Sequence, residues 1–157
     1  GCEGGGGATP VVANQILYSP NNSSGYDGLT YNAETGASIS TYTADSPPAF
    51  TSTTGYFLQS GTLRGITVSN NTVLWSFAGD GTLVGSPIAV NQYVVIGSSS
   101  GNLYALNGAT GQSVWQVTLP APVVASVYAA PFAGLAAGDG MLVVPSGTKL
   151  TAYVLSP

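Results

Sequence analysis

Side chains able to do chemistry are scarce in this chain. Its 157 residues include no histidine, one cysteine, six carboxylates and two cations, Arg64 and Lys149, which gives a net charge of −4. Without histidine, the chain cannot form a Ser-His-Asp triad, a Cys-His pair or a histidine-ligated metal site. Two cations cannot supply the basic surface that binds nucleic acid. The chain alone is therefore predicted to be no enzyme, and to use no cofactor, metal or nucleic acid.

The acidic residues are scattered and mostly adjoin glycine or serine, which is typical of turns. Asp80-Gly81 and Asp139-Gly140 begin like calcium loops but lack the alternating ligands and the closing glutamate. The glycine-rich start lacks the Gly-Lys-Ser/Thr ending of a phosphate loop. We therefore interpret the scattered acids as turn residues: Asp27, Glu34, Asp45, Asp80 and Asp139.

Cys2 is the one residue that suggests attachment to a membrane. Bacterial lipoproteins are cleaved just before a cysteine that follows a small residue, and Gly1-Cys2 with a glycine-rich stretch behind it resembles such a site. The alternative is a lone cysteine without a role. A single cysteine excludes an internal disulfide but allows an intermolecular one. We predict that residues 1–8 form a Gly-rich N-terminal tether with Cys2 as a candidate lipid attachment residue.

A repeated phrase organises the rest of the chain. Residues 101–115 read Gly-Asn-Leu-Tyr-Ala-Leu-Asn-Gly-Ala-Thr-Gly-Gln-Ser-Val-Trp, and weaker copies recur roughly every forty residues. Trp115 corresponds to Trp75 in the second copy and to Ser40 in the first. Prolines at corresponding positions open four units, which we place at about 9–46, 47–85, 86–121 and 122–157.

Each unit has the pattern of short antiparallel strands. Runs of β-branched and aromatic residues alternate with Gly, Asn and Asp clusters. The best helix window, 121–137, contains two prolines and a glycine and is rejected. Units one to three each supply four strands, whereas unit four supplies three, near 124–132, 141–144 and 149–155. The prediction is an all-β fold, a β-propeller segment of about four four-stranded antiparallel blades with the last blade incomplete.

The phrase, following an apolar Tyr-Val-Val-Ile-Gly run, resembles the repeat of pyrroloquinoline-quinone-type (PQQ-like) β-propellers over nearly all of residues 9–156. The resemblance implies that each unit is a blade and that a tryptophan docks between adjacent blades. It implies two blade-docking tryptophans and two glycines in the turn before the outer strand: Trp75, Trp115, Gly36 and Gly111. Ser40 and Asn71 depart from the pattern, so the joints they belong to are expected to pack differently.

The resemblance does not imply that this chain binds a cofactor. Quinone-dependent dehydrogenases of this type hold pyrroloquinoline quinone on the propeller axis with an acidic base, calcium ligands and nearby basic residues. One branch also uses a vicinal cysteine pair. This chain has no residues to which those roles can be transferred, so we place it in a non-enzymatic branch with no cofactor. A fragment of a quinone-dependent dehydrogenase propeller remains an alternative.

Composition favours a location outside the cytoplasm: periplasmic, outer-membrane-associated or extracellular. Only 5% of residues are charged, against about 25% in typical soluble domains. No apolar run reaches the roughly 18 residues of a transmembrane helix. Membrane contact is therefore expected only through a lipid on Cys2.

The predicted function is a non-catalytic cell-envelope or extracellular scaffold or structural subunit. It would bind proteins, either itself or a larger complex, through its end blades and an open β-edge. A second alternative is a subunit of a filament or larger assembly joined by strand complementation. Loop tyrosines are predicted to contribute to partner docking, such as Tyr26, Tyr42, Tyr56 or Tyr128. The alternative for most tyrosines is packing within the blades, since they fall in apolar strand runs.

Overall fold

Four antiparallel sheets follow one another along the chain. The computed structural model describes residues 10–20, 27–123 and 134–154, and no helix occurs within these ranges. The first three sheets have four strands each, and the described part of the fourth has three. In every sheet the strands are neighbours in chain order, so each sheet is a meander. The all-β prediction is confirmed.

We call the four sheets blades 1 to 4. Blade 1 comprises β1 (Val11–Ala13), β2 (Ile16–Pro20), β3 (Asp27–Asn32) and β4 (Ser38–Thr43). Blade 2 comprises β5 (Ala49–Phe50), β6 (Thr54–Gln59), β7 (Thr62–Thr67) and β8 (Val73–Phe77). Blade 3 comprises β9 (Leu83–Val90), β10 (Tyr93–Ser98), β11 (Asn102–Asn107) and β12 (Ser113–Thr118). Blade 4 comprises β13 (Ala136–Gly138), β14 (Met141–Ser146) and β15 (Lys149–Val154).

The start of β9 differs from the sequence prediction, and β13 was not expected. β9 begins at Leu83, ahead of the expected unit boundary at 86, because Leu83 pairs with Ser98 beyond a register shift in the sheet. The innermost described strand of blade 4 is β13, where no strand was expected; the strand predicted near 124–132 falls on residues that lie outside the described ranges. A two-residue turn, Asp139-Gly140, joins β13 to β14, and both residues have positive φ, as hairpin turns of this length require.

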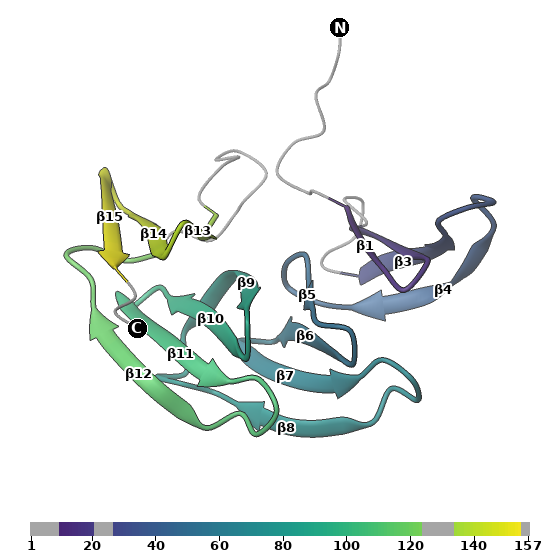
Figure 1. Cartoon of the computed structure of the whole chain (residues 1–157), viewed down its shortest axis with the longest axis horizontal. Coiled ribbons are helices and arrows are strands. Elements are labelled where there is room, and N and C mark those ends of the chain that lie inside the picture. The colour runs from purple at the N-terminus through teal and green to yellow at the C-terminus, as the bar shows by residue number, and fades with distance from the viewer. Residues whose placement is uncertain (1–9, 21–26, 124–133, 155–157) are drawn as a thin grey trace, which may run out of the picture.

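The blades are arranged as sectors of an arc (Figure 1). The first strands β5, β9 and β13 lie toward the inside of the arc, and β4, β8 and β12 lie toward its outside. Each blade between the two ends therefore has one face toward the blade before it and one toward the blade after it. We call these the backward and the forward face, and we use the same names for the corresponding faces of blades 1 and 4.

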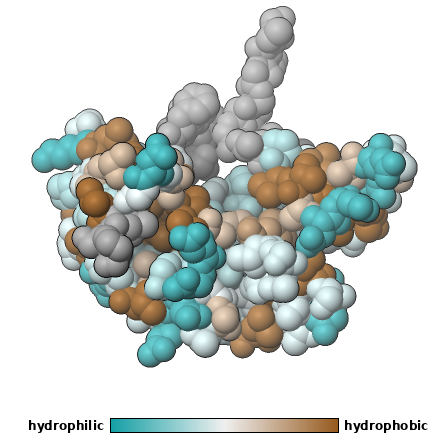
Figure 2. Space-filling model, in the orientation of Figure 1, coloured by the Kyte–Doolittle hydropathy of each residue, from teal (hydrophilic) through white to brown (hydrophobic). Residues whose placement is uncertain are grey.

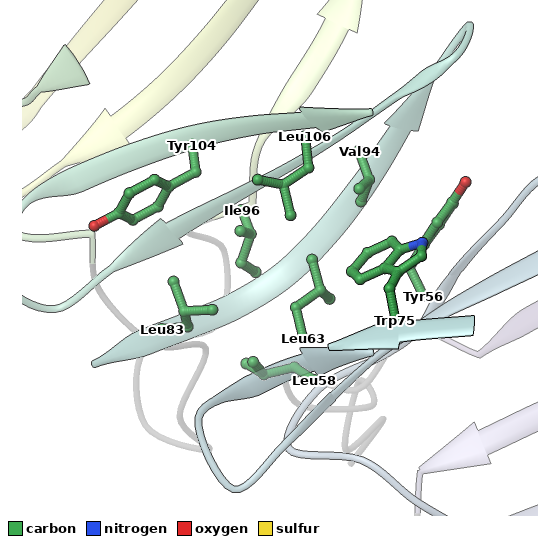
Figure 3. Packing of buried hydrophobic residues seen from close by; sticks show 9 residues of the cluster. All are labelled: Tyr56, Leu58, Leu63, Trp75, Leu83, Val94, Ile96, Tyr104 and Leu106. Atoms are coloured by element: carbon green, nitrogen blue, oxygen red, sulfur yellow. The ribbon is translucent and has the colours of Figure 1, made fainter. Parts of the chain in front are cut away.

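Two apolar clusters fill the joints on either side of blade 3. The first joins the forward face of blade 2 to the backward face of blade 3 (Figure 3); its fully buried members include Leu63, Ile96 and Leu106. The second joins blade 3 to blade 4 through residues such as Leu103 and Val144. Side chains alternate between the two faces of a strand, so one central blade contributes to both clusters.

Candidate functional site at the blade joints and the open ends

Trp75 lies in the joint between blades 2 and 3. It pairs with Gly65 across β7 and β8, and its side chain is 9% exposed. The indole Nε1–H donates a hydrogen bond of 2.9 Å to the carbonyl oxygen of Gly108. The ring lies against Gly111, and Tyr56 packs beside it in Figure 3 with ring centroids 5.9 Å apart. One side chain thus joins two blades by burial and by a hydrogen bond.

Trp115 occupies the corresponding position on the forward face of blade 3 but is 38% exposed. It meets Tyr153 of blade 4 edge to face, with ring centroids 5.4 Å apart. In blade 4 Val154 holds the place of Asn107, and the residues that follow it lie outside the described ranges. The two tryptophans therefore have equivalent places in the repeat but different surroundings.

The joint between blades 1 and 2 is built without a tryptophan. Ser40 takes the position of Trp75 and is exposed. Rings from both blades fill the joint instead, with centroid separations from 4.7 Å to 6.2 Å: Tyr18, Tyr42, Phe50 and Phe57. Burial, and to a smaller degree the neighbouring Tyr18, raises the pKa of Tyr42 to about 12.

Sequence reasoning missed this aromatic cluster. Its rings come from β2, β4, β5 and β6, so neither periodicity nor repeat alignment connects them. The available signal was indirect: a unit that lacks the tryptophan carries aromatic residues on neighbouring strands.

The prediction that loop tyrosines dock partners is wrong for Tyr56 and Tyr42, the two of the named tyrosines that lie within the described residues. Tyr56 is 2% exposed and belongs to the core between blades 2 and 3. Tyr42 is half-buried among the rings of the first joint. Both stand on strands rather than loops, which explains their burial. Tyr26 and Tyr128 lie outside the described residues.

Asp80 organises a polar network at the start of blade 3. Its carboxylate accepts hydrogen bonds from the Asn102 amide and the Ser98 hydroxyl, both at 2.7 Å, and from the Thr82 hydroxyl and backbone N–H. Burial alone would raise the pKa of Asp80, but these hydrogen bonds outweigh it and hold the pKa well below the usual value. Asp45 likewise accepts two backbone N–H groups of the β6–β7 hairpin. Both carboxylates hold loops, as turn residues do.

Apolar side chains are exposed at the two ends of the arc. On the forward face of blade 4, Met141, Leu150 and Val154 are 41%, 73% and 75% exposed. At the other end, Val12 of β1 is 62% exposed. Apolar surface is visible toward both ends in Figure 2. These faces and the outer edge of β15 are the candidate contact surfaces of the described chain.

Other kinds of site find no support in the described ranges. No three acidic or cysteine side chains come together there as a set of metal ligands. Within the same residues no helix is long and apolar enough to cross a membrane. Cys2, the predicted lipid attachment residue, lies outside the part of the chain that the structure describes.

Solved structures share this fold. BamB from Moraxella catarrhalis superposes with a TM-score of 0.70 at 18% identity, over 93% of this chain and 45% of BamB. The computationally designed protein Ika4 superposes with a TM-score of 0.73 at 16% identity, over 97% of this chain and 93% of Ika4. The quinohemoprotein alcohol dehydrogenase ADHIIG from Pseudomonas putida HK5 gives a TM-score of 0.62 at 18% identity, over 87% of this chain and 27% of the enzyme.

The chain spans less than half the length of BamB and about a quarter of the dehydrogenase. No curated protein sequence matches it. A family model does: the family described as outer membrane protein assembly factor BamB matches residues 2–154. With almost the whole chain matched and the β-propeller architecture in place, this chain belongs to the BamB family of PQQ-like repeat proteins.

Proposed function

We propose that the chain is a non-catalytic scaffold of the cell envelope that acts through protein–protein contacts at the ends of its arc. The observation that carries the proposal is the forward face of blade 4. Its β14 and β15 side chains are all apolar: Met141, Val143, Pro145, Leu150, Ala152 and Val154. The forward faces of blades 2 and 3 bury such residues against a neighbouring blade, so this face is suited to bury its own against a partner.

The outer edge of β15 supports the same proposal. In blades 1 to 3 the third strand pairs with a fourth, whereas β15 has no further partner strand among the described residues. An unpaired strand offers a row of backbone N–H and C=O groups to an added strand. This edge also favours the second candidate, a subunit of a filament or larger assembly joined by strand complementation.

Family membership supports an extracytoplasmic location, since the matched family is one of outer membrane assembly factors. Attachment through a lipid on Cys2 remains a prediction. It is tested by Cys2→Ser, which should release the chain from the membrane fraction. Retention of the variant with the membrane would contradict lipid attachment.

Sedimentation velocity of the chain tests the contact surfaces. We expect concentration-dependent association, and we expect the double variant Leu150→Asp/Val154→Asp to lose it because two charges would be buried at the contact. The matched control is Thr148→Asp, in the exposed turn before β15. Small closed species favour the scaffold, and long polymers in negative stain favour the filament. A folded wild-type monomer at every concentration contradicts both.

The enzymatic alternative has its own test. A fragment of a quinone-dependent dehydrogenase should bind pyrroloquinoline quinone, with a change in the absorption spectrum or in the melting temperature. We expect neither at saturating quinone. A saturable shift of either kind would overturn the non-catalytic proposal.

A further inference from the structure

Arg64 is the single arginine of the chain, and it carries its charge without a counterion. It stands on β7, directly opposite Ser76 of β8, on the backward face of blade 2. Among the described residues its guanidinium makes no hydrogen bond and no ion pair. The other cation, Lys149, is exposed at the start of β15, where water solvates its charge. Of the two cations, Arg64 is therefore the one held in a packed joint.

The guanidinium of Arg64 is removed from water on one side only. Its Nε is buried and has no acceptor among the described residues, whereas the side chain as a whole is half-buried. The two terminal nitrogens are not among the buried atoms without a partner, so they reach solvent. A charge that has lost part of its hydration without gaining an acceptor attracts an anion more strongly than a fully hydrated charge does. The open side of the guanidinium is therefore suited to bind one.

The other blades show that the fold does not need a cation at this position. In blade 3 the place of Arg64 belongs to Tyr104, which is 5% exposed and packs edge to face on Phe77. In blade 4 it belongs to Thr151. Tyr104 fills its joint with a ring, whereas Arg64 leaves a buried donor without a partner in the corresponding joint. A residue that breaks the packing pattern in this way is typical of a binding site.

The carboxylates of the described chain do not supply the missing acceptor. Asp45, in the linker between blades 1 and 2, instead accepts the backbone N–H groups of Ser60 and Gly61, at 3.0 Å and 2.9 Å. Ser76 adds a second free donor, since it is exposed and its hydroxyl has no partner among the described residues. Directly opposed residues of neighbouring strands have Cβ atoms about 5 Å apart. The Ser76 hydroxyl and the Arg64 guanidinium can therefore contact the same ligand.

We propose that Arg64 and Ser76 form a binding site for a carboxylate, supplied by an acidic side chain of a protein partner. The carboxylate oxygens accept hydrogen bonds from the open terminal nitrogens of Arg64 and from the Ser76 hydroxyl. A planar guanidinium holds both oxygens of a carboxylate by parallel hydrogen bonds. One cation in a chain of net charge −4 suits a singly charged group better than a doubly charged phosphate. The site lies apart from the end faces on which the proposed function depends, so each can fail without the other.

Titration with a short acidic peptide tests the site. Because the chain has a single arginine, the Nε–H of Arg64 gives one cross-peak in a nitrogen–proton correlation spectrum. At fixed ionic strength, a capped tetraglutamate peptide should move that cross-peak saturably, and the matched tetraglutamine peptide should not. Absence of a shift with tetraglutamate overturns the site, as do equal shifts with tetraglutamate and with added chloride. Inorganic phosphate is the second probe, and a shift at an equal or lower phosphate concentration overturns the assignment to a carboxylate.

Variants then locate the bound peptide through the rise in melting temperature that it causes. Arg64→Met should abolish the rise. Arg64→Lys keeps the charge but loses the paired hydrogen bonds, so it should weaken binding on the order of tenfold. Ser76→Ala removes one neutral donor and should weaken it roughly threefold. The matched control is Lys149→Gln, which removes the same charge from an exposed position and should keep the full rise. An undiminished rise in Arg64→Met, or an equal loss in Lys149→Gln, contradicts the site.

Discussion

The two joints on either side of blade 2 have the same backbone arrangement, but different side chains fill them. In the joint between blades 2 and 3, Trp75 spans the joint and hydrogen-bonds to the turn of the next blade. In the joint between blades 1 and 2, the corresponding Ser40 is exposed and four rings from the inner and outer strands meet instead. The turn that follows differs accordingly, with Gly111 in one case and Asn71 in the other.

We infer from this difference that the tryptophan and the glycine pack as a pair. Gly111 is needed because an indole lies on it, whereas the positive φ alone is met by Asn71 at 57°. The Trp75 joint combines apolar burial with a directed hydrogen bond, which fixes the angle between blades. The aromatic joint depends mainly on ring packing, together with a hydrogen bond of 2.7 Å from the exposed Gln59 amide to the carbonyl oxygen of Thr43. Ring packing tolerates more than one arrangement.

The largest effect should come from Trp75→Ala. It removes a buried indole and leaves the Gly108 carbonyl unpaired, so we expect a loss of about 3–5 kcal/mol in the free energy of unfolding. Trp115→Ala is the matched variant, and its 38% exposure lowers the expected loss to about 1–2 kcal/mol. Urea denaturation measures both, and equal losses would contradict the distinction between the two joints.

The second-largest loss of stability should come from Gly111→Asn, which keeps the turn but inserts a side chain under the Trp75 indole. We expect a loss of about 1–3 kcal/mol from overpacking. Gly36→Asn is the control and should change stability by no more than about 0.5 kcal/mol, because nothing lies within 4 Å of its added Cβ. In a Trp75→Ala background the cost of Gly111→Asn should largely vanish. Additive losses would mean that the pair is not coupled.

The sequence repeat predicted those features of the joints that depend on residues close together in the chain. Turn dipeptides, strand runs and the phase of Trp75 and Trp115 are all carried within one unit, so the four sheets and the missing tryptophan of blade 1 could be predicted. The aromatic joint could not, because Tyr18 and Phe57 meet only after two blades pack. The different exposure of the two tryptophans could not be predicted from the sequence either. Trp75 and Trp115 have the same motif, and only the residues that pack around them differ.

Alkaline pH should weaken the aromatic joint. Tyr42 has its pKa raised from 10.0 to about 12, and the pKa of Tyr18 is raised as well, because burial penalises the phenolate. A folded-state pKa above the unfolded value means that this stability is fully present below pH 10 and is lost as the pH rises toward 12. Melting temperatures from pH 9 to 12 should fall, and Tyr42→Phe should flatten that fall. An identical pH profile in the variant would remove Tyr42 from the cause.

The smallest expected effect is a gain. Arg64 stands on β7 opposite Phe57, on the face of blade 2 that meets the ring joint. Its Nε is buried and has no hydrogen-bond partner among the described residues. Arg64→Met keeps the aliphatic stem and removes the unsatisfied donor, so we expect a gain of about 0.5–1 kcal/mol in urea denaturation. Arg64→Lys, which keeps a charge at the end of the side chain, should gain less. If Arg64→Met instead destabilises the chain, the guanidinium contributes to the aromatic joint in addition to the rings.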